Sequence, residues 1–204
     1  MNESLHRSRL PHIARNIVLY GCAVALGVGS ALWVLKKAPG LTAGVRVGAW
    51  QTDMHAGSTD AGLYTRASIA VHALLALDHN ETMYFVANHD DAGKPLRAVC
   101  SYRVEGVPPR ARWWSVTAYT DDMYLFNDVP GGAYSLNSKT ARLNSQGRFV
   151  LTTGGQPQAG IHWLPTPGNR GLVLTLRVFN PEPELQALPQ SLAPPSITAV
   201  GACA

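Results

Sequence analysis

Residues 112–119 read RWWSVTAY and residues 172–179 read LVLTLRVF, and these two stretches decide the fold of the body. Both are rich in β-branched and aromatic residues and contain neither glycine nor proline, as is typical of strands. The second stretch is apolar enough to predict a central strand. Short β-prone runs and glycine- or proline-rich turns alternate around them. This spacing predicts a mainly β domain, a β-sandwich or jelly-roll-like body.

The rest of the body follows the same pattern, with one exception. The sequence predicts further strands over 82–88, 100–104, 124–126, 134–136, 149–153 and 161–164, and a short one around 45–50. The exception is the run LYTRASIAVHALLAL at 63–77, which has good helix formers and apolar residues at helical spacing. We expect one core-facing α-helix there, packed on the sheets.

An apolar segment near the N-terminus predicts a membrane anchor. Residues 17–35 read IVLYGCAVALGVGSALWVL, and this uncharged run would span about 28 Å as a helix, close to the hydrocarbon thickness of a bilayer. A cleaved signal peptide and a lipoprotein signal at Cys22 are the alternatives. The apolar run continues past the small residues 29–31, however, and most of it follows Cys22. We therefore expect a single N-terminal transmembrane helix.

Charge around the apolar run sets the expected topology and the domain plan. Three arginines precede the run and two lysines follow it, which favours a cytoplasmic N-terminus and a body outside the membrane. The expected location is the bacterial inner membrane, with the soluble domain in the periplasm. The expected segments are a cytoplasmic segment 1–16, a transmembrane helix 17–35, a linker 36–58, a β domain 59–183 and a proline-rich extended tail 184–204.

Charge and motifs narrow the class of function. The chain of 204 residues carries a net charge of +4, without the clustered lysines and arginines of a nucleic-acid-binding protein. The sequence His89-Asp90-Asp91 offers possible metal ligands, but these are also common turn residues. Zinc spacing, a phosphate loop and a serine elbow are all missing from the sequence. We expect no nucleic-acid partner, no cofactor and no metal, and the case for an enzyme is weak.

Two cysteines lie outside the apolar run, Cys100 and Cys203. In an oxidising compartment they can form a disulfide that fixes the C-terminal tail. The alternative is a buried Cys100 and a free Cys203. The sequence leaves both open.

Aromatic and cationic residues on the predicted strands are the candidates for ligand binding. Neighbours on a strand point to opposite faces, so one of Trp113 and Trp114 can be buried while the other is partly exposed for stacking. Arg112 and Arg177 can clamp an anionic ligand or form structural salt bridges, with Glu81, Asp91 and Asp121 as the expected carboxylates. Trp163 completes the set of candidates.

Four motifs in fixed order resemble the DUF1214 family: RWWSVTAY at 112–119, YSLNS at 134–138, WLP at 163–165 and LTLRVF at 174–179. The resemblance covers roughly residues 59–183. It implies a β-rich domain that is often encoded or fused with a DUF1254 domain, and it implies no settled biochemical activity. Ala133 stands where this family would have an arginine before the Tyr-Ser-Leu element, which weakens any role for that position.

The leading hypothesis is a membrane-anchored periplasmic accessory or binding module without catalysis of its own. Its expected partner is a DUF1254-type protein or a membrane complex. The small residues Gly21, Ala25 and Gly29 recur every four positions of the apolar run and would permit close contact with a partner helix. The alternative is an envelope carbohydrate-active enzyme or other hydrolase that uses carboxylates near Trp113 or Trp114.

Overall fold

The computed structural model describes residues 9–37, 44–72, 76–126, 129–201 and 203, which divide into two compact units, Met1–Leu41 and Thr42–Ala204. The first unit holds one helix, α2 (Arg9–Lys37). Its segment His12–Trp33 is long and apolar enough to cross a membrane, and its side chains are exposed. An apolar surface around a whole helix is what lipid contact requires. The expected spanning helix is therefore present, with length and composition as the evidence.

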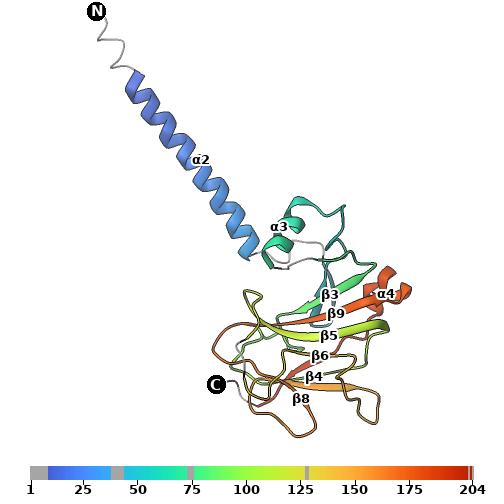
Figure 1. Cartoon of the computed structure of the whole chain (residues 1–204). Helices are drawn as coiled ribbons and strands as arrows, with labels where there is room; N and C mark the ends of the chain where they lie inside the picture. Colours follow the sequence, from blue (N-terminus) through green and yellow to red (C-terminus); the bar gives the residue numbers. More distant parts are fainter. Residues whose placement is uncertain (1–8, 38–43, 73–75, 127–128, 202, 204) are drawn as a thin grey trace, which may run out of the picture. The chain divides into compact units, whose positions relative to one another are not determined.

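The second unit contains a six-stranded antiparallel sheet in the order β1-β2-β3-β9-β5-β6 (Figure 1). Its longest strands are β5 (Ala111–Thr120) and β9 (Leu172–Pro181), which pair along their full length. β9 lies between β3 and β5, so the prediction of a central strand is confirmed. The shorter strands are β1 (Val45–Val47), β2 (Trp50–Thr52), β3 (Thr82–Ala87) and β6 (Ser135–Asn137).

A four-stranded sheet in the order β10-β4-β7-β8 forms the second layer. Its strands are β4 (Tyr102–Gly106), β7 (Phe149–Thr153), β8 (His162–Leu164) and β10 (Ser196–Ala199). The core lies between the two sheets, where Trp114 of β5 packs on Phe149 of β7 with 4.7 Å between ring centroids. The mainly β, two-sheet fold predicted from the sequence is confirmed.

Both ends of the body extend beyond the expected domain 59–183. β1 and β2 lie in the segment expected to be a linker, yet β2 pairs with β3, and Trp50 is fully buried. The expected tail contains α4 (Pro183–Ala187), the 3₁₀ helix η1 (Pro189–Ser191) and β10, which pairs with β4. The two ends also meet, because the Trp50 indole N–H donates to the Pro195 carbonyl over 2.7 Å. Pairing of β2 with β3 and of β10 with β4 therefore orders two segments that the local sequence predicts as a linker with one short strand and an extended tail.

Two local predictions differ from the structure. The helix expected over 63–77 is present as α3 (Leu63–His72), but Leu63 and Tyr64 are 84% and 65% exposed. Residues 73–75 of that prediction lie outside the described residues. The strand expected over 124–126 is reduced to a single bridge between Leu125 and Tyr119, because Met123 turns the chain with a φ of 65°.

Candidate functional site

The outer surface of the six-stranded sheet gathers several candidate residues in one place. Side chains alternate along a strand, so the residues of β3, β5 and β9 that alternate with the core positions lie on the other surface of the sheet. Among them Thr82, Ser115, Thr117 and Thr175 are only 1–6% exposed, whereas the larger side chains are half-buried. We call this surface the Arg177 face. It consists of three cross-strand rows, Trp113–Phe179–Thr82, Ser115–Arg177–Tyr84 and Thr117–Thr175–Val86, with Tyr119 beyond them.

Arg177 is the only cationic side chain of the three rows, and it is half-buried. Its guanidinium donates to the Tyr119 hydroxyl over 2.9 Å and, at 3.4 Å, more weakly to the Thr117 hydroxyl. It also lies 5.3 Å from the centre of the Tyr119 ring, within the range of a cation–π contact. No carboxylate pairs with Arg177 among the described residues. Its positive charge is therefore matched only by neutral groups.

Aromatic and hydroxyl groups surround this guanidinium. Trp113 is half-buried and packs edge-on against Phe179, with 5.1 Å between ring centroids. The Tyr84 hydroxyl accepts a hydrogen bond from the Leu77 N–H over 3.2 Å. Thr175 is 2% exposed, and its hydroxyl has no partner among the described groups. The Thr82 hydroxyl likewise has no described partner. The Arg177 face therefore combines a cation without a carboxylate among the described residues, large aromatic rings and two unsatisfied buried hydroxyls.

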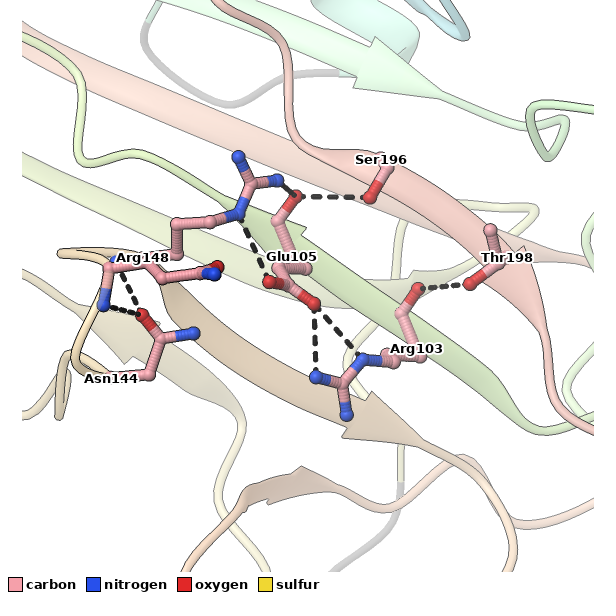
Figure 2. Close-up of polar contacts among 7 residues, drawn as sticks. Arg103, Glu105, Asn144, Arg148, Ser196 and Thr198 are labelled. Atoms are coloured by element: carbon pink, nitrogen blue, oxygen red, sulfur yellow. Dashed lines mark hydrogen bonds and ion pairs between the residues drawn. The ribbon is translucent and has the colours of Figure 1, made fainter.

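The outer surface of the four-stranded sheet carries a different cluster, centred on Glu105 (Figure 2). Arg103 donates to Glu105 Oε2 from Nη2 over 2.9 Å and from Nε over 3.1 Å. Arg148 donates to Glu105 Oε1 from Nε over 3.0 Å. The hydrogen bonds from Arg103, together with those from Arg148, hold the pKa of the Glu105 carboxyl below its ordinary value.

Neighbouring polar groups complete this network. The Ser196 hydroxyl donates to the Glu105 carbonyl over 3.2 Å, and the Asn144 side-chain oxygen accepts from the Arg148 backbone N–H over 3.0 Å (Figure 2). The cluster thus links β10, β4 and the turn before β7. Its charged groups satisfy one another, which is the arrangement of a structural ion pair. Our sequence reasoning missed it, although the spacing of Arg103 and Glu105 on one face of a strand was a usable signal.

The structure separates the remaining candidates from the Arg177 face. Trp114 is 3% exposed and belongs to the core. Trp163 lies on β8, in register with Thr152 of β7, and its indole N–H donates to the Gly154 carbonyl over 2.8 Å. Arg112 is exposed near the start of β5. Of the predicted ligand-binding residues, the structure therefore brings together only Trp113 and Arg177.

The carboxylates expected to pair with Arg112 and Arg177 have other contacts. Asp91 Oδ2 accepts from the Ile197 backbone N–H over 2.8 Å, and Asp121 Oδ1 lies 3.6 Å from Arg170 Nε. Glu81 forms no ion pair in the described part of the chain. The expected pairing is wrong for Arg177 because β5 is hydrogen-bonded beside β9, and the β5 residue next to Arg177 is Ser115, which has no carboxylate.

The sequence His89-Asp90-Asp91 forms a turn at the end of β3. Asp90 Oδ1 accepts from the backbone N–H groups of Ala92 and Lys94 over 3.0 and 2.8 Å, so this carboxylate closes the turn. Within the described ranges, no three His, Cys, Asp or Glu side chains are grouped to hold a metal ion. Both aspartates thus have structural roles in this turn, which is the plainer of the two interpretations of the motif.

A disulfide joins Cys100 and Cys203, whose Cα atoms are 4.8 Å apart. Cys100 is buried in the core, whereas Cys203 lies at the exposed end of the chain. The bond closes a loop with a sequence separation of 103 residues. Together with the pairing of β10 on β4, it fixes the C-terminal segment on the body.

Comparison with known proteins identifies the family of this body. Residues 81–183 match the model of DUF1214, described as a protein of unknown function. The chain belongs to the DUF1214 family. The family match covers β3 to β9 and therefore includes both long strands of the Arg177 face. No curated protein matches the sequence.

Two bacterial proteins of solved structure align with this chain. The VPA0106 protein from Vibrio parahaemolyticus aligns with a TM-score of 0.56 and 20% identity over 70% of this chain and 36% of its own. An uncharacterized protein from Burkholderia cenocepacia aligns with a TM-score of 0.44 and 17% identity over 58% of this chain and 29% of its own. This chain thus spans about a third of the length of these proteins. At this level of identity, the likeness to VPA0106 concerns the fold alone.

Proposed function

We propose that this DUF1214 protein is a membrane-anchored accessory module whose body binds a partner protein and performs no catalysis of its own. The observation that carries the proposal is the Arg177 face. It presents a half-buried guanidinium without a carboxylate beside exposed or half-exposed aromatic side chains. Tryptophan, tyrosine and arginine are the residues that dominate the binding energy of protein interfaces.

The proposed location is the bacterial inner membrane, with the body in the periplasm. The helix α2 supports the anchor, and the arginines before its apolar span support a cytoplasmic N-terminus. The disulfide between Cys100 and Cys203 supports an oxidising compartment, because such bonds are rare in the reducing cytosol.

The proposed partner is a DUF1254-type protein or a membrane complex, and α2 offers a second possible contact with it. Gly21, Ala25 and Gly29 follow one another at four-residue spacing on this helix. A Cβ atom added at Gly21, Gly27 or Gly29 would meet nothing within 4 Å, so a bulkier side chain fits at each of these positions of the helix. Small residues at such spacing let helix backbones approach closely in lipid.

The first test is recovery of the full-length protein from its native membrane in a mild detergent, followed by mass spectrometry. We expect a partner in stoichiometric amount. Recovery of the protein alone at native expression would contradict the accessory role. In that case, assays for glycan binding and hydrolysis would test the alternative of a carbohydrate-active enzyme or other hydrolase.

A helix variant then tests the contact in the membrane. The double substitution Gly21→Leu with Gly29→Leu places bulky side chains on the small-residue surface of α2, whereas Gly27→Leu adds the same bulk at a position off that surface. We expect the double variant to lose a partner that contacts α2 and the Gly27→Leu control to keep it. Full retention by the double variant would limit the interaction to the body.

A further inference from the structure

We infer that the Arg177 face is the docking surface of the body, and that it binds an acidic segment of a partner protein whose aspartate or glutamate carboxylate pairs with Arg177. The inference rests on the proposed function, since both require a protein partner. It adds the location of the contact, the chemistry of the partner and the residue that recognises it.

The first argument is the unmatched charge. Arg103, Arg148 and Arg177 are the half-buried arginines of the described body, while its other described arginines are exposed to water. Arg103 and Arg148 share the Glu105 carboxylate. Arg177 has no such group, although partial burial makes an unpaired charge costly. A carboxylate from another molecule would give Arg177 what the chain itself gives the other two.

The second argument is hydrogen-bonding capacity. A guanidinium has five N–H donors, and within the described part of the chain those of Arg177 make hydrogen bonds only to the hydroxyls of Tyr119 and Thr117. The remaining donors suffice for a carboxylate, which arginine binds in a planar, two-pronged geometry. The buried Thr175 hydroxyl, two residues along β9, has no partner among the described groups and points to the same face.

The third argument is the surrounding apolar surface. Trp113 and Phe179 lie on one side of Arg177, and Tyr119 lies on the other. Leu125 is bridged to Tyr119 and is 48% exposed, and the adjacent Tyr124 is 70% exposed. Large side chains around a central polar contact exclude water from it, which is the arrangement of an interface hot spot.

The shape of the surface favours a protein over a small molecule. Small ligands bind in concave pockets that enclose most of their surface. The Arg177 face is the side of three adjacent strands, and a groove of about 600 Å³ in the described chain is lined by other residues, around Arg46, Gln51 and His89. A protein segment laid across the strands would cover the half-buried side chains of this face, Trp113, Arg177 and Tyr119.

Site-specific photocrosslinking in native membranes tests the inference. A photoreactive phenylalanine analogue replaces Leu125, which borders the Arg177 face, or Thr198, which is exposed on β10 of the other sheet. We expect the probe at Leu125 to crosslink one discrete protein and the probe at Thr198 not to do so. In the Leu125 background, Arg177→Met should reduce the crosslink at least tenfold, while Arg112→Met on the neighbouring strand β5 should leave it unchanged.

Charge reversal then identifies the partner's carboxylate. Mass spectrometry of the crosslinked peptide locates aspartates and glutamates near the contact. Reversing the correct one to arginine should abolish the crosslink to the unchanged protein and restore it to Arg177→Glu. Restoration also shows that the Arg177→Glu protein is folded. Arg177→Lys keeps the positive charge without the two-pronged geometry and should retain a reduced crosslink. A remaining crosslink would show that a variant at this position still folds and binds.

The outcomes separate this inference from the proposed function. If a partner co-purifies but the probe at Leu125 crosslinks nothing, the docking surface is wrong and the accessory role stands. A crosslink to lipid or saccharide, a crosslink that Arg177→Met leaves unchanged, or a contact peptide without an essential carboxylate would also overturn the inference. If nothing co-purifies with the unchanged protein, the proposed function itself fails.

Discussion

The two sheets use half-buried arginines in opposite ways on their outer surfaces. On the four-stranded sheet, Arg103 and Arg148 converge on Glu105, which stands two residues from Arg103 on the same strand (Figure 2). On the six-stranded sheet, Arg177 stands between Ser115 and Tyr84, and its hydrogen bonds to described residues all go to hydroxyls. The difference teaches that the neighbours of an arginine, on its own strand and on the adjacent strand, decide whether it is structural or available. On the first surface the two arginines pair with Glu105, whereas on the second Arg177 has no carboxylate partner among the described residues.

The largest expected effect concerns the side of the six-stranded sheet opposite to the Arg177 face. Trp114→Ala removes a core side chain that packs on Phe149, and we expect a loss of about 3–5 kcal/mol in the free energy of unfolding. Trp113→Ala, one residue away on the half-buried outer side, should cost only about 1 kcal/mol. Chemical denaturation of the full-length variants in detergent measures both. Equal losses would show that the two sides of β5 do not differ as described.

The next effect concerns the end of the chain that completes the four-stranded sheet. Cys203→Ser opens the long disulfide loop, and we expect a loss of about 2–4 kcal/mol through greater freedom of the unfolded chain. Hydrogen exchange should rise first in β10, because this strand pairs with β4 alone. Cys22→Ser, at a free cysteine of α2, is the control and should change neither measurement. Unchanged exchange in β10 would show that strand pairing holds the segment without the disulfide.

A smaller effect on stability is expected when Arg148 and Arg177, one arginine from each sheet surface, are each replaced by methionine. Arg148→Met removes one of the two partners of Glu105 and should cost up to about 1 kcal/mol. Arg177→Met removes a half-buried charge without a carboxylate and should be neutral, or stabilising by up to about 1 kcal/mol, while it abolishes partner crosslinking. Thermal unfolding of the two variants gives the comparison. A larger loss for Arg177→Met than for Arg148→Met would indicate that Arg177 is chiefly structural.

The smallest effect is the pH dependence of the four-stranded sheet. The folded-state pKa of Glu105 lies below its ordinary value of about 4.5, so its contribution to stability is present above that value. The contribution is lost as the pH falls through the lower folded-state pKa, because the protonated carboxyl no longer pairs with Arg103 and Arg148. Glu105→Gln should therefore shrink the fall in melting temperature between neutral and acid pH, whereas Arg177→Met should leave it unchanged. Identical pH profiles for Glu105→Gln and the unchanged protein would contradict this role.

Much of the fold was predictable because its signals are local. The alternation and turn spacing of 82–88, 149–153 and 172–179 predicted β3, β7 and β9 closely, and the apolar composition of 172–179 predicted that β9 is central. The apolar span within α2 was equally clear, since lipid requires a continuous apolar surface. These features depend on neighbouring residues, which the sequence displays directly.

The ends of the body were predicted only in part: one short strand was expected around 45–50, where β1 and β2 lie, and none was expected at β10. β1, β2 and β10 are three or four residues long and lie among glycines and prolines, so their identity as strands comes from pairing with β3 and β4. The apolar periodicity of α3 predicted a buried surface, yet Leu63 and Tyr64 are exposed. Periodicity shows that a helix has an apolar side, but not which neighbour, if any, covers it.

For the candidate site, the sequence by itself singled out Trp113 and Arg177 from residue type and from their place on long strands. Only the tertiary structure decided their surroundings. The register of β3, β9 and β5 puts Ser115 and Tyr84 beside Arg177, while Asp91 and Asp121 make contacts elsewhere. The physical reason is that strand neighbours far apart in sequence set the charge balance of a sheet surface, and that pairing exists only in the folded chain.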